Sequence, residues 1–279
     1  MKIDIAGVQV VSVLKQEAIA AIDQFVQNGQ PHLVTTPYSE LIVFAQRDEN
    51  YKKVLNSANL SLPDGIGILW AAKFLSLQRK KQFSIFNFHF SNLILSLAAI
   101  IFYPAWIRSV IKEQVTGSHL IWDIAKLAAD RGYSLALVGG TDDVAGKAGE
   151  ELRSQNKELR INLALSDCEF DDALVERINQ SNSDILLIAY SPPKQEMWLA
   201  QNLQKLNVKV AIGLGGTFDY IAGKQPQAPK FLHDMGLEWL WRLITQPWRI
   251  KRMWNAVPVF IWKVYKYKLK NYGLRIDNS

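Results

Sequence analysis

The stretch DILLIAYSPPKQE, residues 184–196, decides the fold of this chain. Its first half is an apolar run with little alternation, which is typical of a strand covered on both faces of a parallel sheet. Two prolines then fix a turn, and the polar residues after it are typical of the start of a helix. Three further runs have the same form, at 32–36, 134–140 and 208–216. Together they predict buried parallel strands.

Amphipathic segments alternate with these runs, and each is typical of a helix. They lie at 39–47, 118–130, 143–155, 171–181 and 194–203. The alternation predicts an α/β fold with a Rossmann-like, mainly parallel sheet flanked by helices. The N-terminal MKIDIAGVQVVSVL alternates like a strand and lacks a basic region followed by an apolar block. We therefore expect no signal peptide.

The composition indicates a globular protein, because 49% of the 279 residues are apolar and 21% are charged. Cys168 is the single cysteine, so neither an internal disulfide nor a zinc cluster is expected, which fits a reducing compartment. The sequence contains no GxGxxG, P-loop or DxD motif. We therefore expect no bound metal and no cofactor.

The net charge of +6 is unevenly distributed. Nine Lys or Arg and no acidic residue lie between Glu238 and Asp277, interleaved with Trp239, Trp241, Trp248, Trp254 and Trp262. Basic residues mixed with aromatics suit nucleic acid or an anionic membrane surface. The stretch 82–107 contains no Lys, Arg, Asp or Glu, which favours the membrane.

Ligands in parallel α/β sheets bind beyond the carboxyl ends of the strands, so the loops after each run are the candidate site. Asp64 follows a Pro and precedes an apolar helix, so it is either an N-cap or a carboxylate base at the mouth of a cleft. The Gly139-Gly140 pair either brings backbone N–H groups to a phosphate or allows tight strand-to-helix packing, and Gly215 has the same two interpretations. Lys194 and Gln195 suit a diphosphate or a sugar, but they also suit a solvated first helical turn.

Six segments carry a resemblance in the same chain order: TTPYSELIVFAQRD, ANLSLPDGIGILWAAK, VTGSHL, LALVGGT, RINQSNSDILLIAYSPPKQEMW and VAIGLGGTFDYIAGKQPQAPKFLHDMGLEWLWRL. They resemble the WecG/TagA/CpsF family of bacterial glycosyltransferases over nearly the whole chain, apart from an insertion between Lys73 and Val115. The resemblance implies transfer of an N-acetylmannosamine-type sugar from a UDP donor to a polyprenyl-diphosphate-linked saccharide, with inversion, in cell-surface polysaccharide synthesis. It also implies that Asp64 is the catalytic base, Thr36 an active-site threonine and Gln195 a substrate-binding glutamine.

Further substrate-binding residues are expected in the matched loops and at the start of the tail: Gly65, Thr116, Gly139, Gly140, Lys194, Gly215, Asp219 and Arg242. Gln114 and His119 stand where the family usually has an Arg and an acid, and Tyr38 replaces a common Asn. Because the missing Arg would stabilise the departing UDP, we expect Lys112, Lys194 or an arginine of the tail to compensate.

The resemblance divides the chain into a glycosyltransferase domain at 1–236, with an apolar insertion at about 79–112, and a membrane-associating appendage at 237–279. The insertion is long enough to span a bilayer. A single span would separate Asp64 from Gln195, so a re-entrant hairpin or an in-plane helix broken at Pro104 fits better. A helix in the core or in an oligomer interface is the alternative.

The sequence therefore predicts a peripheral or monotopic enzyme on the cytoplasmic face of the cell membrane. Its expected partners are a UDP-sugar, a polyprenyl-diphosphate-linked acceptor and the membrane surface, with no nucleic acid; homo-oligomerisation is left open. One alternative is a catalytically degraded membrane scaffold of the same fold, for which Gln114, His119 and Tyr38 are the evidence. Another is a Rossmann-type oxidoreductase, against which the missing GxGxxG motif counts.

Overall fold

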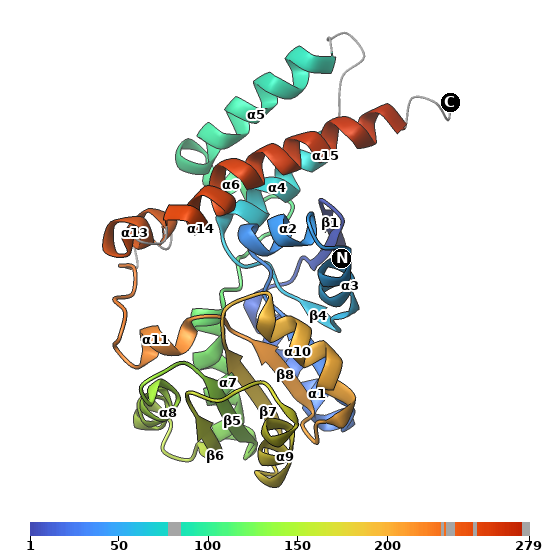
Figure 1. Ribbon diagram of the computed structural model, residues 1–279. Coiled ribbons are helices and arrows are strands. Elements are labelled where there is room, and N and C mark those ends of the chain that lie inside the picture. Colours follow the sequence, from blue (N-terminus) through green and yellow to red (C-terminus); the bar gives the residue numbers. More distant parts are fainter. Residues whose placement is uncertain (78–84, 230–231, 233–237, 248–249, 275–279) are drawn as a thin grey trace.

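The computed structural model describes residues 1–77, 85–229, 232, 238–247 and 250–274 (Figure 1). Six parallel strands form one sheet in the order β4-β3-β8-β7-β5-β6. The strands are β3 (His32–Thr35), β4 (Leu60–Ser61), β5 (Ser134–Gly139), β6 (Arg160–Leu165), β7 (Ile185–Ala189) and β8 (Val210–Gly213). All four predicted strands are present, so the α/β class predicted from the sequence is confirmed.

Helices cover both faces of the sheet, which is why β5, β7 and β8 are buried along their whole length. Successive residues of a strand point to opposite faces. Leu187 therefore packs with α1 (Lys15–Asn28), α7 (Gly117–Arg131) and α8 (Val144–Gln155), whereas Leu186 packs with α9 (Asp172–Gln180) and α10 (Lys194–Asn202). The short helices η1 (Leu203–Lys205) and α11 (Thr217–Ile221) flank β8 in the chain.

A second core lies beside the sheet, built on an N-terminal hairpin of β1 (Lys2–Ile5) and β2 (Val8–Val11). The strand-like alternation at the N-terminus does form β structure, but as two strands, because Ala6 and Gly7 adopt positive φ angles of 52° and 89° and turn the chain back. The hairpin packs with α2 (Ser39–Ala45), α3 (Glu49–Ser57) and α4 (Ile66–Ser76).

The apolar insertion forms α5 (Ile85–Phe102) and α6 (Pro104–Ile107), so the predicted break at Pro104 is confirmed. The Trp70 indole donates to the Ser96 hydroxyl at 3.0 Å and fixes α5 on α4. Ile107 and Ile111 are buried in the second core, whereas Leu95 and Phe102 of α5 are exposed. Within the described residues, no helix is both long and apolar enough to span a bilayer.

The C-terminal segment is helical and packs on the second core. It consists of α13 (Glu238–Thr245), α14 (Ile250–Trp254), a π-helical turn η3 (Asn255–Val259) and α15 (Phe260–Leu274). Phe260 and Val264 are buried, and the Lys268 ammonium donates to the Phe74 and Leu77 carbonyls at the end of α4. Figure 1 shows α5 and α15 together at the end of the molecule opposite α9.

Candidate active site

One cavity of about 610 Å³ lies at the carboxyl ends of the parallel strands. The loops after β3, β4, β5, β7 and β8 all contribute to its wall, as do α5 and the C-terminal helices. This is the place expected for a ligand site in a parallel α/β sheet. The predicted site residues that line the cavity are Thr36, Asp64, Gly65, Gly140, Gln195, Gly215 and Asp219.

Asp64 lies in the loop between β4 and α4 and is partly buried at the cavity wall. The N-cap position of α4 is taken by its neighbour Gly65. The backbone N–H of Gly117, the first residue of α7, donates to Asp64 Oδ2 at 3.4 Å. The N-cap interpretation for α4 is therefore wrong, and the carboxylate is held between two loops at the cavity.

Thr36 follows β3 and ties that strand to β8. Its hydroxyl donates to the Gly213 carbonyl at 3.3 Å, and the side chain is buried. Thr36 and Asp64 lie in the loops that follow the adjacent strands β3 and β4, and a bond from the Asp64 N–H to the Pro37 carbonyl, at 3.1 Å, joins these two loops. The contact of Thr36 with substrate stays a prediction.

Gln195 connects the loops after β7 and β8. Its Oε1 accepts hydrogen bonds from the backbone N–H groups of Tyr190 and Gly215, both at 3.1 Å. Gly213 leaves room for this amide, because a Cβ there would lie 2.9 Å from Gln195 Nε2 and would displace it. The buried Gln195 amide therefore shapes the cavity wall, and its predicted role in holding substrate stays a prediction.

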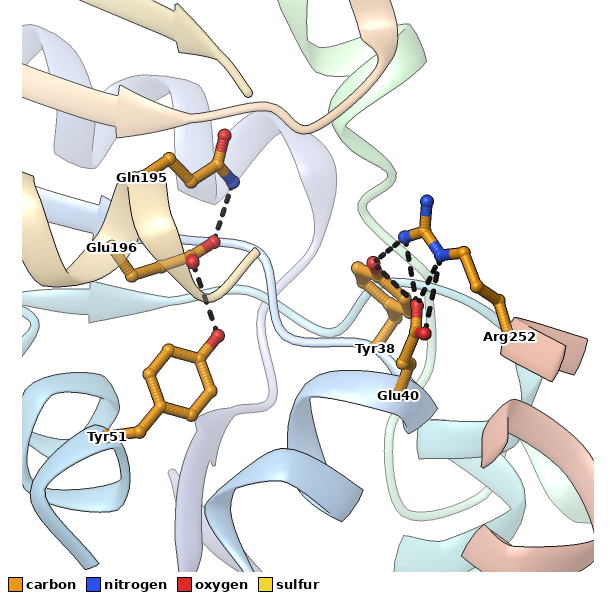
Figure 2. Close-up of polar contacts among 6 residues, drawn as sticks. All are labelled: Tyr38, Glu40, Tyr51, Gln195, Glu196 and Arg252. Atoms are coloured by element: carbon orange, nitrogen blue, oxygen red, sulfur yellow. Dashed lines mark hydrogen bonds and ion pairs between the residues drawn. The ribbon is translucent and has the colours of Figure 1, made fainter. Parts of the chain in front are cut away.

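A buried carboxyl group orients this glutamine. Gln195 Nε2 donates to Glu196 Oε1 at 2.6 Å, and the Tyr51 hydroxyl donates to Glu196 Oε2 at 3.2 Å. Figure 2 shows the three side chains in one line from α10 to α3. Burial raises the pKa of Glu196 and also raises that of Tyr51. Sequence reasoning missed Glu196, because an acidic residue in the first turn of a helix is common and has no distinctive pattern.

The glycine pair at the end of β5 allows this strand to pack closely against β7. A Cβ on Gly139, whose φ is +133°, would collide with the Ala189 backbone of β7. The Gly140 N–H donates to the Ala189 carbonyl at 3.1 Å, so this predicted phosphate donor is engaged within the sheet. Gly140 lines the cavity and Gly139 does not. Nucleotide contact at this turn stays a prediction.

Two other predicted residues, Lys194 and Thr116, are not among the described residues that line the cavity. The Lys194 ammonium lies over the Phe170 ring, 4.8 Å from its centre. The Thr116 hydroxyl is hydrogen-bonded to His119 Nδ1 at 2.8 Å. The Arg242 side chain lies outside the described part of the structure, although its backbone is in α13.

Arg252 of α14 brings positive charge to the cavity instead. Its Nε donates to both carboxylate oxygens of Glu40, and its Nη2 donates to Glu40 Oε2 at 2.9 Å and to the Tyr38 hydroxyl at 3.0 Å. Figure 2 shows the third guanidinium nitrogen turned away from Glu40. A tail arginine was among the expected compensating charges, but the sequence could not say which one.

The comparison with known families decides what kind of protein carries this cavity. The model for the glycosyl transferase WecG/TagA/CpsF family matches residues 3–100 and 92–273. The chain belongs to the WecG/TagA/CpsF glycosyltransferase family. The resemblance drawn from the sequence is confirmed, as is the enzyme class it implied.

Two curated relatives of this WecG/TagA/CpsF family member are both named N-acetylglucosaminyldiphosphoundecaprenol N-acetyl-β-D-mannosaminyltransferase. One, from Staphylococcus aureus (strain MRSA252), is 24% identical over 96% of this chain and 94% of its own length. The other, from Bacillus subtilis (strain 168), is 25% identical over 84% of this chain and 79% of its own length.

Gln114, where the family usually has an arginine, also lines the cavity of this WecG/TagA/CpsF member. Besides Arg252, Lys224 brings a cation to the wall, where it forms an ion pair with Asp142 at 2.7 Å and a hydrogen bond with Thr141. Lys112 and Lys194 are absent from the described lining. Arg252 and Lys224 are thus the cations in the described lining, and their role as compensating charge stays a prediction.

Proposed function

We propose that this chain transfers an N-acetylmannosamine-type sugar from a UDP donor to a polyprenyl-diphosphate-linked N-acetylglucosamine, with inversion at the anomeric carbon. The acceptor and the sugar come from the names of the two relatives, which cover most of the chain. The single observation that carries the proposal is the position of Asp64, a carboxylate in the wall of the cavity formed by five strand-end loops.

In this mechanism Asp64 acts as the general base. It takes the proton from the acceptor hydroxyl as that oxygen attacks the anomeric carbon of the donor. The new C–O bond forms on the face opposite the UDP, the bond to the diphosphate oxygen breaks, and UDP leaves with the electron pair. The N–H of Gly117 at the start of α7 orients the carboxylate for this step.

Positive charge offsets the charge that develops on the leaving diphosphate. Arg252 and Lys224 both line the cavity, and each is held in place by an acidic partner. Cations held beside the leaving diphosphate lower the energy of a transition state in which negative charge develops there. The two residues therefore stabilise the departing UDP in place of the missing family arginine.

The enzyme would work at the cytoplasmic face of the membrane, where a polyprenyl acceptor is anchored. Exposed apolar side chains belong to α5 and to the C-terminal helices: Phe90, Ile94, Leu95, Ile101, Phe102, Ile244, Ile250, Trp254 and Trp262. In Figure 1, α5 and α15 lie side by side. Lys251, Lys266 and Lys270 are exposed on the same C-terminal helices. Apolar and basic groups together bind an anionic interface.

Incubation of the purified protein with a panel of UDP-N-acetylhexosamines and a short-chain lipid-diphosphate acceptor tests the proposal. Mass spectrometry should find one transferred N-acetylhexosamine, with UDP-N-acetylmannosamine as the preferred donor. NMR of the product should show a β linkage, as inversion of an α-linked donor requires. Absence of turnover with every donor would favour the degraded scaffold instead.

A further inference from the structure

The cavity has two chemically different ends. Asp64, Gln195 and Arg252 belong to its polar part, whereas the wall between α5 and α15 is apolar. On the α5 side this wall consists of Leu97, Ile100 and Ile101, and on the tail side of Val257 and Ile261. A small number of polar groups beside an extended apolar wall is typical of a site for an amphiphilic ligand.

The apolar wall is continuous with the catalytic loop. A Cβ on Gly67, three residues after Asp64, would lie 3.4 Å from the Phe260 ring and would collide with the Ser39 hydroxyl. Gly67 thus lets the start of α4 touch α15 directly. A ligand that contacts Asp64 can therefore extend along α15 without leaving the cavity.

The wall also opens at the surface of the molecule. Leu97 and Ile100 are partly buried against the second core, but Ile101 is 54% exposed and Phe102 is 83% exposed. A wall that only completed the core would have no exposed end of this size. Ile101 and Phe102 both belong to the C-terminal end of α5.

The structure assigns this wall to the isoprenoid chain of the acceptor: the isoprene units next to the diphosphate lie between α5 and α15. The inference rests on the proposed function for the identity of the acceptor. It adds a role for the insertion, which supplies one side of the wall and contains no charged residue between positions 82 and 107.

Connectivity favours this occupant over a second copy of the chain. An isoprenoid diphosphate sugar carries, in one molecule, a sugar for the polar part of the cavity at Asp64 and an apolar chain for the wall between α5 and α15.

Binding of two acceptors, measured by calorimetry without a bilayer, tests the inference. Both are N-acetylglucosaminyl diphosphates, one with a methyl aglycone and one with a farnesyl aglycone below its micellar concentration. Wild-type protein should bind the farnesyl compound at least about tenfold more tightly, since apolar area leaves water. Ile101→Gln should lose most of that preference. The matched control Leu95→Gln should keep it, because Leu95 lies on the same helix, is 64% exposed and does not line the cavity.

The outcomes separate this inference from the proposed function, because binding does not require turnover. Equal affinity for both aglycones overturns the isoprenoid site, even if sugar transfer is observed. A farnesyl preference that Ile101→Gln removes supports the site, even if no donor gives transfer and the proposed function fails. A ligand-free dimer that Ile101→Gln converts to a monomer, measured by light scattering, would assign the wall to a second copy and overturn the inference.

Discussion

The Arg252 guanidinium binds the Glu40 carboxylate at 2.9 Å, although the two residues lie 212 positions apart in the chain. Glu40 belongs to α2, directly after the loop that follows β3, and Arg252 belongs to α14. The Glu40 side chain is only 5% exposed, so this ion pair is shielded from solvent on one side. The contact holds the C-terminal segment over the cavity and sets the position of a cation there.

Replacement of this arginine by lysine should impair transfer. In Arg252→Lys the charge remains, but a single ammonium cannot reproduce the bonds to Glu40 and Tyr38. We expect kcat/KM to fall about 10- to 100-fold, corresponding to about 1.4–2.7 kcal/mol of transition-state stabilisation. The neighbouring exposed Lys251→Arg is the control and should retain wild-type kcat/KM with a short-chain acceptor. Equal kcat/KM in Arg252→Lys and wild type would remove Arg252 from the mechanism.

Glu196 should make stability depend on pH in a defined direction. Burial raises its pKa in the folded state above the ordinary value of 4.5, so the folded protein binds the proton more tightly than the unfolded chain does. Its contribution to stability is thus complete below pH 4.5 and is lost as pH rises through the raised pKa. In thermal melts from pH 4 upward, Glu196→Gln should lack this loss. The exposed Glu150→Gln should show the same dependence of melting temperature on pH as wild type. If the melting temperatures of all three proteins changed in parallel with pH, the assignment of this pH dependence to Glu196 would be contradicted.

Lys268 should show the opposite trend at alkaline pH. Burial lowers its pKa from 10.5 to about 8, so between these values the unfolded chain binds more protons than the folded protein. The free energy of unfolding should therefore rise with pH across this window. In urea titrations, the stability of wild type relative to Lys268→Met should increase by about 1–2 kcal/mol between pH 7.5 and 10.5, after discounting for residual solvent contact. If the difference in free energy of unfolding between wild type and Lys268→Met stayed constant over this pH range, Lys268 would not be buried as a cation against α4.

The basic face of the C-terminal helices should control binding to anionic membranes. Lys251, Lys266 and Lys270 are exposed, and each contributes about 1 kcal/mol near an anionic surface. Their joint replacement by Gln should lower partitioning onto phosphatidylglycerol liposomes about 100-fold in cosedimentation. Joint replacement of the exposed body lysines Lys126, Lys147 and Lys157 changes the net charge equally and should have little effect. Similar losses in both triple variants would point to a general charge effect.

The order of strands and helices could be predicted from the sequence because buried parallel strands leave strong apolar runs. The run at 184–190 became β7 in the middle of the sheet, and the proline at 104 did separate two helices. The N-terminal hairpin was missed because its alternation continues across the turn. Only the positive φ angles of Ala6 and Gly7 reveal the reversal.

The site was predictable as a set of loops but not as a set of contacts. Asp64 and Gln195 were placed at strand ends by pattern and resemblance, and both do line the cavity. The tie between Gln195 and Glu196, and the choice of Arg252 within the basic tail, depend on tertiary packing between segments far apart in the chain. Neither leaves a periodic signal in the sequence.

The most direct test of the account is transfer by Asp64→Asn. Asparagine preserves the size of the side chain and its acceptor oxygen for the Gly117 N–H, but it cannot take a proton from the acceptor hydroxyl. Single-turnover transfer from UDP-N-acetylmannosamine to a short-chain lipid-diphosphate acceptor would be followed by mass spectrometry, with a thermal melt to confirm folding. We predict a rate lowered by about 100-fold or more at an unchanged melting temperature. Transfer at the wild-type rate by folded Asp64→Asn would contradict the central claim.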